Sequence, residues 1–140
     1  MNKTLFIGDL HGRFEIVERA LKTPYNIIFI GDYVDSFNRS YEDQIKTLNL
    51  VLNAIHEEPE RVQGLLGNHE LSYKYHEMRC SGFSFAVESV VGPMKLKPPL
   101  KEYIWCGDYF VSHAGVSKKL LTTLKQDFKT YLEAGNFFQI

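Results

Sequence analysis

Four short apolar runs in this chain each end in glycine and polar residues, and this regularity constrains the fold more than any other feature. The runs read TLFIG, NIIFIG, RVQGLLG and YFVSHAG, at residues 4–8, 26–31, 61–67 and 109–115. Such short aliphatic runs, bounded by turn residues, predict buried β-strands. In an open α/β sheet, ligands bind at the carboxyl ends of the strands. The sequence therefore predicts a ligand site where these strands end.

Amphipathic stretches separate the first three runs and predict helices. In the first stretch, Phe14, Val17 and Leu21 share one helical face. The second opens with Ser40 and Asp43 in a capping-box pattern. It ends before Pro59, and its predicted apolar stripe consists of Ile45, Leu48, Leu52 and Ile55. This alternation predicts an α/β domain, and the Pro-, Gly- and Lys-containing stretch 90–103 is predicted to be a loop.

Composition favours one soluble globular domain over residues 1–140. The chain is 44% hydrophobic and 24% charged, with 16 basic and 17 acidic side chains spread along it. With charges so balanced, the chain has no overall electrostatic field that would attract nucleic acid or an anionic membrane. No run approaches the roughly 20 apolar residues of a membrane helix. The N-terminus does not resemble a signal peptide, and Cys80 and Cys106 form no CxxC pair, so we expect a cytoplasmic protein.

The polar tips of the four predicted strands offer a set of metal-ligating side chains. The tips read GDLHG, GDYVD, GNHE and SHAG, and they supply Asp9, His11, Asp32, Asp35, Asn68, His69, Glu70 and His113. Carboxylates crowded into one cleft repel one another unless cations lie between them. Imidazole and oxygen ligands without thiolate favour manganese, iron, zinc or magnesium. Asp32 is the natural bridge between two such ions, because a carboxylate has two oxygens.

These motifs, in this order, resemble the calcineurin-like metallophosphoesterases, and specifically the serine/threonine phosphoprotein-phosphatase branch of phage or bacterial type. The resemblance covers roughly Thr4 to Ser117. It implies a four-layer α/β/β/α sandwich and a dinuclear metal centre, with manganese favoured. It also implies direct attack on the phosphoester by metal-bound hydroxide.

The resemblance further implies a role for individual residues. Asp9, His11 and Asp32 would hold one metal, and Asp32, Asn68 and His113 the second. His69 would protonate the leaving oxygen, with Asp35 orienting it. If Asn68 and His69 lie in extended backbone, their side chains point apart, which leaves His69 free for this proton transfer.

Two departures from the family pattern qualify this expectation. Ser36 and Phe37 follow GDYVD where the phosphatases have Arg-Gly, so another arginine must bind the substrate phosphate. Arg79 is preferred, with Arg39 and Arg13 as the other candidates. No histidine follows His113 to supply the family's C-terminal GH motif. The sandwich is therefore expected to be incomplete at its C-terminal side.

Three explanations for the missing histidine stay open. The sequence belongs to a shortened chain, a partner chain or oligomer completes the site, or water takes the place of the missing ligand. The expected substrates are phosphoserine or phosphothreonine in proteins, or a small phosphorylated metabolite. The alternatives are a catalytically impaired metal-binding or interaction fragment, and a hydrolase of dinucleoside polyphosphates or cyclic nucleotides. Taken singly, the aspartates could cap turns and the histidines could be buried structural residues. Glu70 is expected to support the ligands rather than bind metal, and His56 and His76 to lie on the surface.

Overall fold

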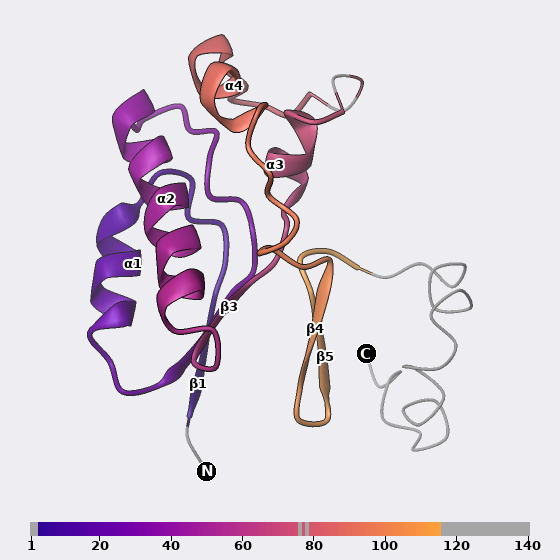
Figure 1. The fold of residues 1–140 in the computed structure, drawn as a ribbon. Helices are drawn as coiled ribbons and strands as arrows, with labels where there is room; N and C mark the ends of the chain where they lie inside the picture. Colours follow the sequence, from indigo (N-terminus) through magenta and orange to yellow (C-terminus); the bar gives the residue numbers. More distant parts are fainter. Residues whose placement is uncertain (1–2, 76, 78, 116–140) are drawn as a thin grey trace.

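A parallel three-stranded sheet forms the centre of the protein. The computed structural model describes residues 3–75, 77 and 79–115 (Figure 1). The strands pair in the order β1-β2-β3, and their bounds are Thr4–Ile7 for β1, Asn26–Phe29 for β2 and Val62–Gly64 for β3. The crossover helices are α1 (Phe14–Leu21) and α2 (Tyr41–Glu57). Three of the four predicted strands thus form this sheet, and both predicted helices are confirmed.

The central strand β2 packs against a different layer on each face of the sheet. Ile27 and Phe29 belong to the main hydrophobic core, together with residues of α1 and α2. Ile28 points the other way and packs with Leu65 and Ile104. Burial on both faces is typical of parallel sheets, and it explains why the run NIIFI is apolar throughout rather than alternating.

Helix α2 begins where its cap predicts. The Ser40 hydroxyl accepts a hydrogen bond from the Asp43 N–H at 3.1 Å, which satisfies one of the free donors of the first turn. The predicted stripe is only partly right. Leu48 and Ile55 are buried, whereas Ile45 and Leu52 are half-buried at its edge. The remaining buried positions of the helix are Gln44, Thr47, Val51 and Ala54.

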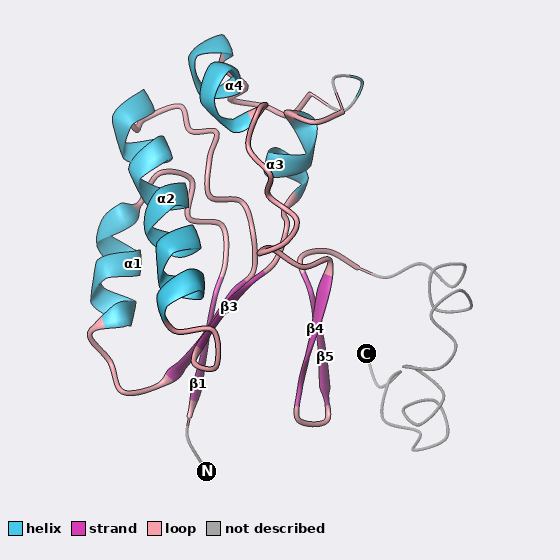
Figure 2. Cartoon of the chain, viewed as in Figure 1, coloured by secondary structure: helices cyan, strands magenta, loops and turns pink. Residues whose placement is uncertain are grey.

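The second half of the described chain contains elements that the sequence reading did not find. These are α3 (Asn68–Ser72), α4 (Phe85–Val91) and strand β4 (Tyr103–Cys106). Strand β4 pairs antiparallel with the predicted strand β5 (Tyr109–Ser112) to form a hairpin (Figure 2). Since α4 extends to Val91, the predicted loop is shorter at its start.

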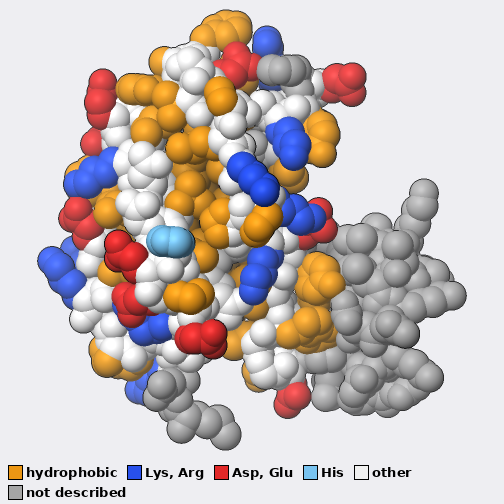
Figure 3. Space-filling view, viewed as in Figure 1, with side chains coloured by type: hydrophobic (Ala, Val, Ile, Leu, Met, Phe, Trp, Pro, Cys, Tyr) orange, Lys and Arg blue, Asp and Glu red, His pale blue; other side chains and the backbone are white. Residues whose placement is uncertain are grey.

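The described residues supply three layers of the predicted sandwich: the α1/α2 pair, the parallel sheet and the β4–β5 hairpin (Figure 1). The expectations for the segment after His113, and the surface placement predicted for His76, fall outside the described residues. His56 is exposed at the end of α2. Within residues 3–75, 77 and 79–115, no helix is long and apolar enough to cross a membrane. Acidic and basic side chains are interspersed on the face shown in Figure 3.

Candidate metal centre

The loops that follow β1, β2, β3 and β5 meet at one edge of the sheet, named the metal-binding edge for the candidate ligands that it carries. Asp9 and His11 follow β1, and Asp32 follows β2. Asn68 and His69 open α3 soon after β3, and His113 directly follows β5. Parallel strands in one sheet place their carboxyl ends together, and the hairpin brings the fourth loop to the same edge.

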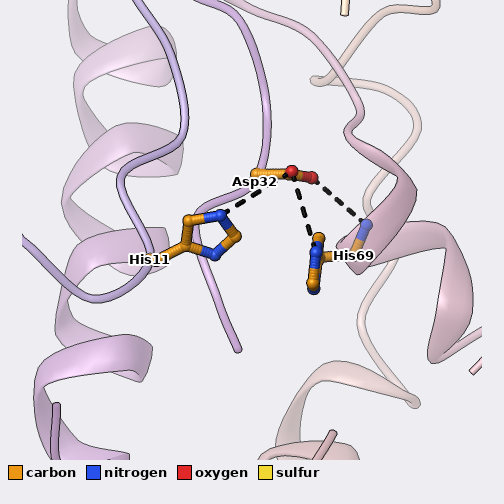
Figure 4. Close-up of side chains that lie close together, drawn as sticks. All are labelled: His11, Asp32 and His69. Atoms are coloured by element: carbon orange, nitrogen blue, oxygen red, sulfur yellow. Dashed lines mark hydrogen bonds and ion pairs between the residues drawn. The ribbon is translucent and has the colours of Figure 1, made fainter. Parts of the chain in front are cut away.

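Asp32 lies at the centre of this cluster and is 5% exposed. Its Oδ1 is 3.4 Å from His113 Nε2, and its Oδ2 is 3.9 Å from both His11 Nε2 and His69 Nε2. Its Oδ1 also accepts a hydrogen bond from the His69 backbone N–H at 3.2 Å. Figure 4 shows His11 and His69 pointing toward the carboxylate from opposite sides. Three imidazoles therefore converge on one buried carboxylate.

Hydrogen bonds fix which imidazole nitrogen of His11 and of His113 faces that carboxylate. His11 Nδ1 lies 2.8 Å from the carbonyl oxygen of Val34, and His113 Nδ1 lies 2.7 Å from that of Ile30. Because a carbonyl can only accept, each Nδ1 carries a proton, and each ring turns its Nε2 toward Asp32. In a neutral ring this Nε2 offers a lone pair, which a carboxylate repels unless a cation lies between them. The donor set thus fits divalent metal ions of the borderline or hard type.

Asp32 belongs to two groups of candidate metal ligands. The first contains His11, Asp32 and His69, and the second contains Asp9, Asp32 and His113. In each group one ligand atom of every member lies within 4.8 Å of the others. The structure brings all the predicted ligands together, and it groups Asp9 with His113 and His69 with His11. The resemblance implied Asp9 with His11 instead. The implied pairing of Asn68 with His113 agrees with their contact at 2.8 Å.

Asn68 lies beside the second group. Its Oδ1 is 2.8 Å from His113 Nε2, and its Nδ2 donates to Cys80 Sγ at 3.2 Å. The thiol therefore helps to hold the amide with its oxygen toward the metal-binding edge. The premise of extended backbone at Asn68 and His69 is wrong, because both residues lie in the first turn of α3. Their side chains still diverge, since successive helical residues are rotated by about 100°.

His69 is paired with Asp35. Its Nδ1 is 2.8 Å from Asp35 Oδ2, and the Asp35 side chain is fully buried. Its ring meets the ring of His11 edge-on, with centroids 4.8 Å apart. The pairing leaves His69 Nε2 facing the cleft, where it can ligate a metal or transfer a proton.

Glu70 holds the backbone of the site in place. It is fully buried, and its carboxylate accepts hydrogen bonds from four backbone N–H groups at 2.7–3.3 Å, those of Asp32, Tyr33, Val34 and Gly67. Burial raises the pKa of Glu70, and the hydrogen bond from Tyr33 opposes that rise. The side chain ties the loop after β2 to the start of α3, as expected for a residue that supports ligands. The GNHE motif was the only sequence signal for this role.

The backbone at the site is strained. Four non-glycine residues have positive φ: Asp9 (54°), His11 (42°), Asp32 (57°) and Asp35 (63°). Gly67 is required for a different reason, because a Cβ there would lie 2.1 Å from Asp32 Oδ1. Strained residues of this kind cluster at functional sites, where the surrounding structure holds them in place.

Comparison with known proteins agrees with this geometry. The sequence model of the calcineurin-like phosphoesterases matches residues 3–137. The chain belongs to this family. A solved structure with the same fold is a protein serine/threonine phosphatase from Saccharomyces cerevisiae, described as similar to human phosphatase PP5. The two chains are 20% identical with a TM-score of 0.59, and the match covers 83% of this chain and 39% of the yeast one.

Members of the calcineurin-like phosphoesterase family use divalent metals. In this member, a pocket of about 330 Å³ opens beside the metal-binding edge. Its lining residues are His11, Arg13, Asp35, Ser36, Phe37, Asn38, His69 and Ser81. Arg13 is thus the arginine in the pocket, while Arg39 forms an ion pair with Glu15 at 2.6 Å. The guanidinium of Arg79 lies 4.7 Å from the centre of the Phe83 ring.

Proposed function

We propose that this calcineurin-like phosphoesterase is a phosphomonoesterase with a dinuclear metal centre. One observation carries the proposal: the buried Asp32 is shared by two groups of candidate ligands whose imidazole Nε2 atoms face its carboxylate. A single carboxylate with two oxygens is suited to hold two cations close together. Such pairs of cations stabilise both the attacking and the leaving oxygen of an in-line displacement at phosphorus.

The proposed metal ligands are Asp9, His11, Asp32, Asn68 and His113. They offer nitrogen and oxygen atoms only, and we propose manganese as the preferred metal, ahead of iron, zinc and magnesium. Divalent cations at these residues would neutralise phosphoryl oxygens and lower the pKa of water toward neutrality. The chain itself contributes the fixed orientation of His11 and His113, through the carbonyl groups of Val34 and Ile30.

His69 and Asp35 are the proposed proton-transfer pair. Asp35 accepts from His69 Nδ1 and so directs Nε2 toward the cleft. Protonated at Nε2, His69 can donate to the leaving oxygen of a phosphomonoester held in the pocket that it lines. Because the Asp35 carboxylate is buried, it holds the ring in one orientation with little competition from water.

The proposed substrates are phosphoserine or phosphothreonine in a protein, or a small phosphorylated metabolite. The yeast structure, described as a protein serine/threonine phosphatase, supports the first. For the phosphate-binding arginine we propose Arg13, since it lines the pocket together with His11 and His69. The other two sequence-based candidates, Arg79 and Arg39, contact the Phe83 ring and Glu15. Arg13 itself donates from Nη1 to the Leu10 carbonyl oxygen at 3.2 Å, so its place in the pocket is the reason for preferring it.

A second candidate follows from the coverage of the yeast phosphatase, of which this chain matches 39%. In that case residues 1–140 are one domain that binds metal, and turnover requires a partner chain or a second copy. A direct test is manganese-dependent hydrolysis of p-nitrophenyl phosphate by the 140-residue chain. Asp32→Asn is expected to reduce turnover about 1,000-fold, which corresponds to about 4 kcal/mol of lost stabilisation.

The control variant Asp108→Asn removes the charge of an exposed carboxylate in the hairpin turn and should retain full turnover. A folded, manganese-loaded wild-type chain without turnover would favour the second candidate. Comparison of a phosphopeptide, diadenosine tetraphosphate and a cyclic nucleotide as substrates would then separate a phosphomonoesterase from the nucleotide hydrolases.

A further inference from the structure

Tyr73, which directly follows α3, is a buried phenol that the mechanism above does not use. It is 2% exposed, and its hydroxyl donates a hydrogen bond to Asp35 Oδ1. The hydroxyl oxygen of Tyr73 also accepts a hydrogen bond from the backbone N–H of Ser84 at 3.3 Å. Because Ser84 fills the acceptor position, the hydroxyl proton is directed to Asp35. Burial and the bond to Asp35 raise the pKa of Tyr73, so it remains a donor at ordinary pH.

The two oxygens of Asp35 are divided between two partners. Oδ1 accepts from Tyr73, and Oδ2 accepts from His69 Nδ1 at 2.8 Å. The backbone N–H of Asp35 donates to the side chain of Gln44 at 2.9 Å. These bonds matter because rotation of an aspartate carboxylate about χ2 has only broad preferences of its own. Tyr73 therefore sets which way the second oxygen points.

Aromatic packing holds Tyr73 in this position. Its ring stacks on Phe83, with centroids 5.0 Å apart and planes inclined by 21°. Phe83 meets Phe85 edge-on, and the guanidinium of Arg79 lies over both of those rings. Phe83 therefore packs directly on the ring whose hydroxyl meets Asp35, and Phe85 and Arg79 in turn contact Phe83.

We infer that Tyr73 is a positioning residue for proton donation by His69, because its hydroxyl fixes the Asp35 carboxylate that orients the imidazole. This inference rests on the proposed phosphomonoesterase function. It predicts a signature that depends on the leaving group. p-Nitrophenolate leaves phosphorus without much help from an acid, whereas the more basic phenolate needs a proton. A displaced His69 would therefore slow phenyl phosphate much more than p-nitrophenyl phosphate.

The test compares Tyr73→Phe with the wild-type chain on these two substrates, with saturating manganese throughout. Tyr73→Phe is expected to lower kcat about tenfold for phenyl phosphate and less than about twofold for p-nitrophenyl phosphate, with KM unchanged; general acid catalysis as a whole contributes about 100-fold or more. Asp35→Asn should show the same pattern more strongly. The double variant should resemble Asp35→Asn alone, since Tyr73 acts only through Asp35.

Tyr33→Phe is the matched control. Its buried hydroxyl donates to the carbonyl oxygen of Leu65 at 2.7 Å rather than to a carboxylate, so its loss should lower stability without changing the ratio of the two rates. Phe83→Leu provides a second variant that keeps the Tyr73 hydroxyl and loosens its ring. It should slow phenyl phosphate about threefold relative to p-nitrophenyl phosphate, and it decides the matter if Tyr73→Phe does not fold.

Equal loss on both substrates, or no loss on either, would overturn the positioning role while leaving the proposed function intact. A wild-type chain that hydrolyses neither aryl phosphate would overturn the proposed function, and the role of Tyr73 with it. A difference between the two substrates that also occurs in Tyr33→Phe would count against Tyr73 as well.

Discussion

The metal-binding edge is assembled from two regions that are held in place very differently. The loops carrying Asp9, His11 and Asp32 follow strands of the parallel sheet, whose central strand β2 is buried on both faces. His113 comes from the β4–β5 hairpin, which packs on that sheet through the small cluster containing Ile104. Backbone hydrogen bonds at Lys101 connect the segment before β4 to Gly64 and Leu66.

This difference shows how the site depends on distant parts of the chain. Glu70 and the parallel sheet fix Asp32 without help from the hairpin. His113 reaches the site through its own bond to Ile30 and its contact with Asn68. One ligand group, His11, Asp32 and His69, therefore comes from the loops after β1, β2 and β3, whereas the other is complete only when the hairpin is docked. The two regions should respond differently to substitution and to metal.

The largest effect is expected from removing one imidazole in each region. His113→Ala should weaken one manganese site about 100-fold and leave the other nearly unchanged, and His11→Ala should do the reverse; loss of even an outer-shell partner costs up to about 100-fold. Titration calorimetry measures both sites. His56→Ala, at an exposed position of α2, is the control. Loss of both sites in His113→Ala would show that the two groups are not separable.

Glu70→Gln should destabilise the region around the parallel sheet, where Glu70 joins the loop after β2 to the start of α3. The new amide would turn an N–H₂ donor toward two backbone N–H groups that now donate to Glu70. Leaving such buried donors unsatisfied is expected to cost about 2 kcal/mol in the free energy of unfolding. Urea denaturation measures this change, with the exposed Glu57→Gln as the control. An unchanged denaturation midpoint would mean that Glu70 does not hold the loop.

Metal should stabilise the docked hairpin more than the sheet. With manganese at about ten times its Kd, amide exchange in β4 and β5 should slow about tenfold, or about 1.4 kcal/mol, because His113 joins the hairpin to the site. Hydrogen exchange of β2 amides serves as the internal reference and should change little. The effect should disappear in His113→Ala. Uniform protection of both regions would contradict a separately docked hairpin.

The smallest effect is expected at Cys80. Cys80→Ala removes the sulfur that accepts from Asn68 Nδ2, so the amide oxygen is held less firmly toward His113. Because thiols are weak acceptors, manganese affinity should fall only about threefold. Cys106→Ala is the matched control, since Cys106 lies on β4 near Thr4. Equal affinities in the two variants would exclude an orienting role for Cys80.

The sequence predicts the parts of this fold that short-range patterns encode. The apolar runs before Gly8 and Gly31 became β1 and β2, and the Ser40 cap begins α2 as expected. Helix α3 was missed because its N-cap is Gly67, which has no capping side chain. Strand β4 was missed because its four residues follow a Pro- and Lys-containing stretch and show no clear period.

For the candidate site, too, the sequence predicts what short-range patterns encode and misses what depends on long-range contacts. Motifs named the candidate ligand residues, but the grouping of Asp9 with His113 depends on where the hairpin docks, which no local pattern contains. The contact between Tyr73 and Asp35 joins residues 38 positions apart and was invisible for the same reason. Arg79 was favoured by its nearness to GNHE along the chain, whereas nearness in space favours Arg13.

The left-handed backbone at Asp9, His11, Asp32 and Asp35 has a consequence for the evolution and engineering of this chain. At each position glycine would fit the backbone with less strain, at a saving of about 1 kcal/mol or more. A selection for thermal stability alone would therefore favour glycine most at the exposed Asp9, whereas a selection for activity would keep its carboxylate. Asp35 would be kept under both selections, because glycine there would leave the Tyr73 hydroxyl and the His69 Nδ1 without their acceptor. Deep mutational scanning under the two selections should separate Asp9 from Asp35, and would so distinguish a side chain kept for function from one that also holds the fold.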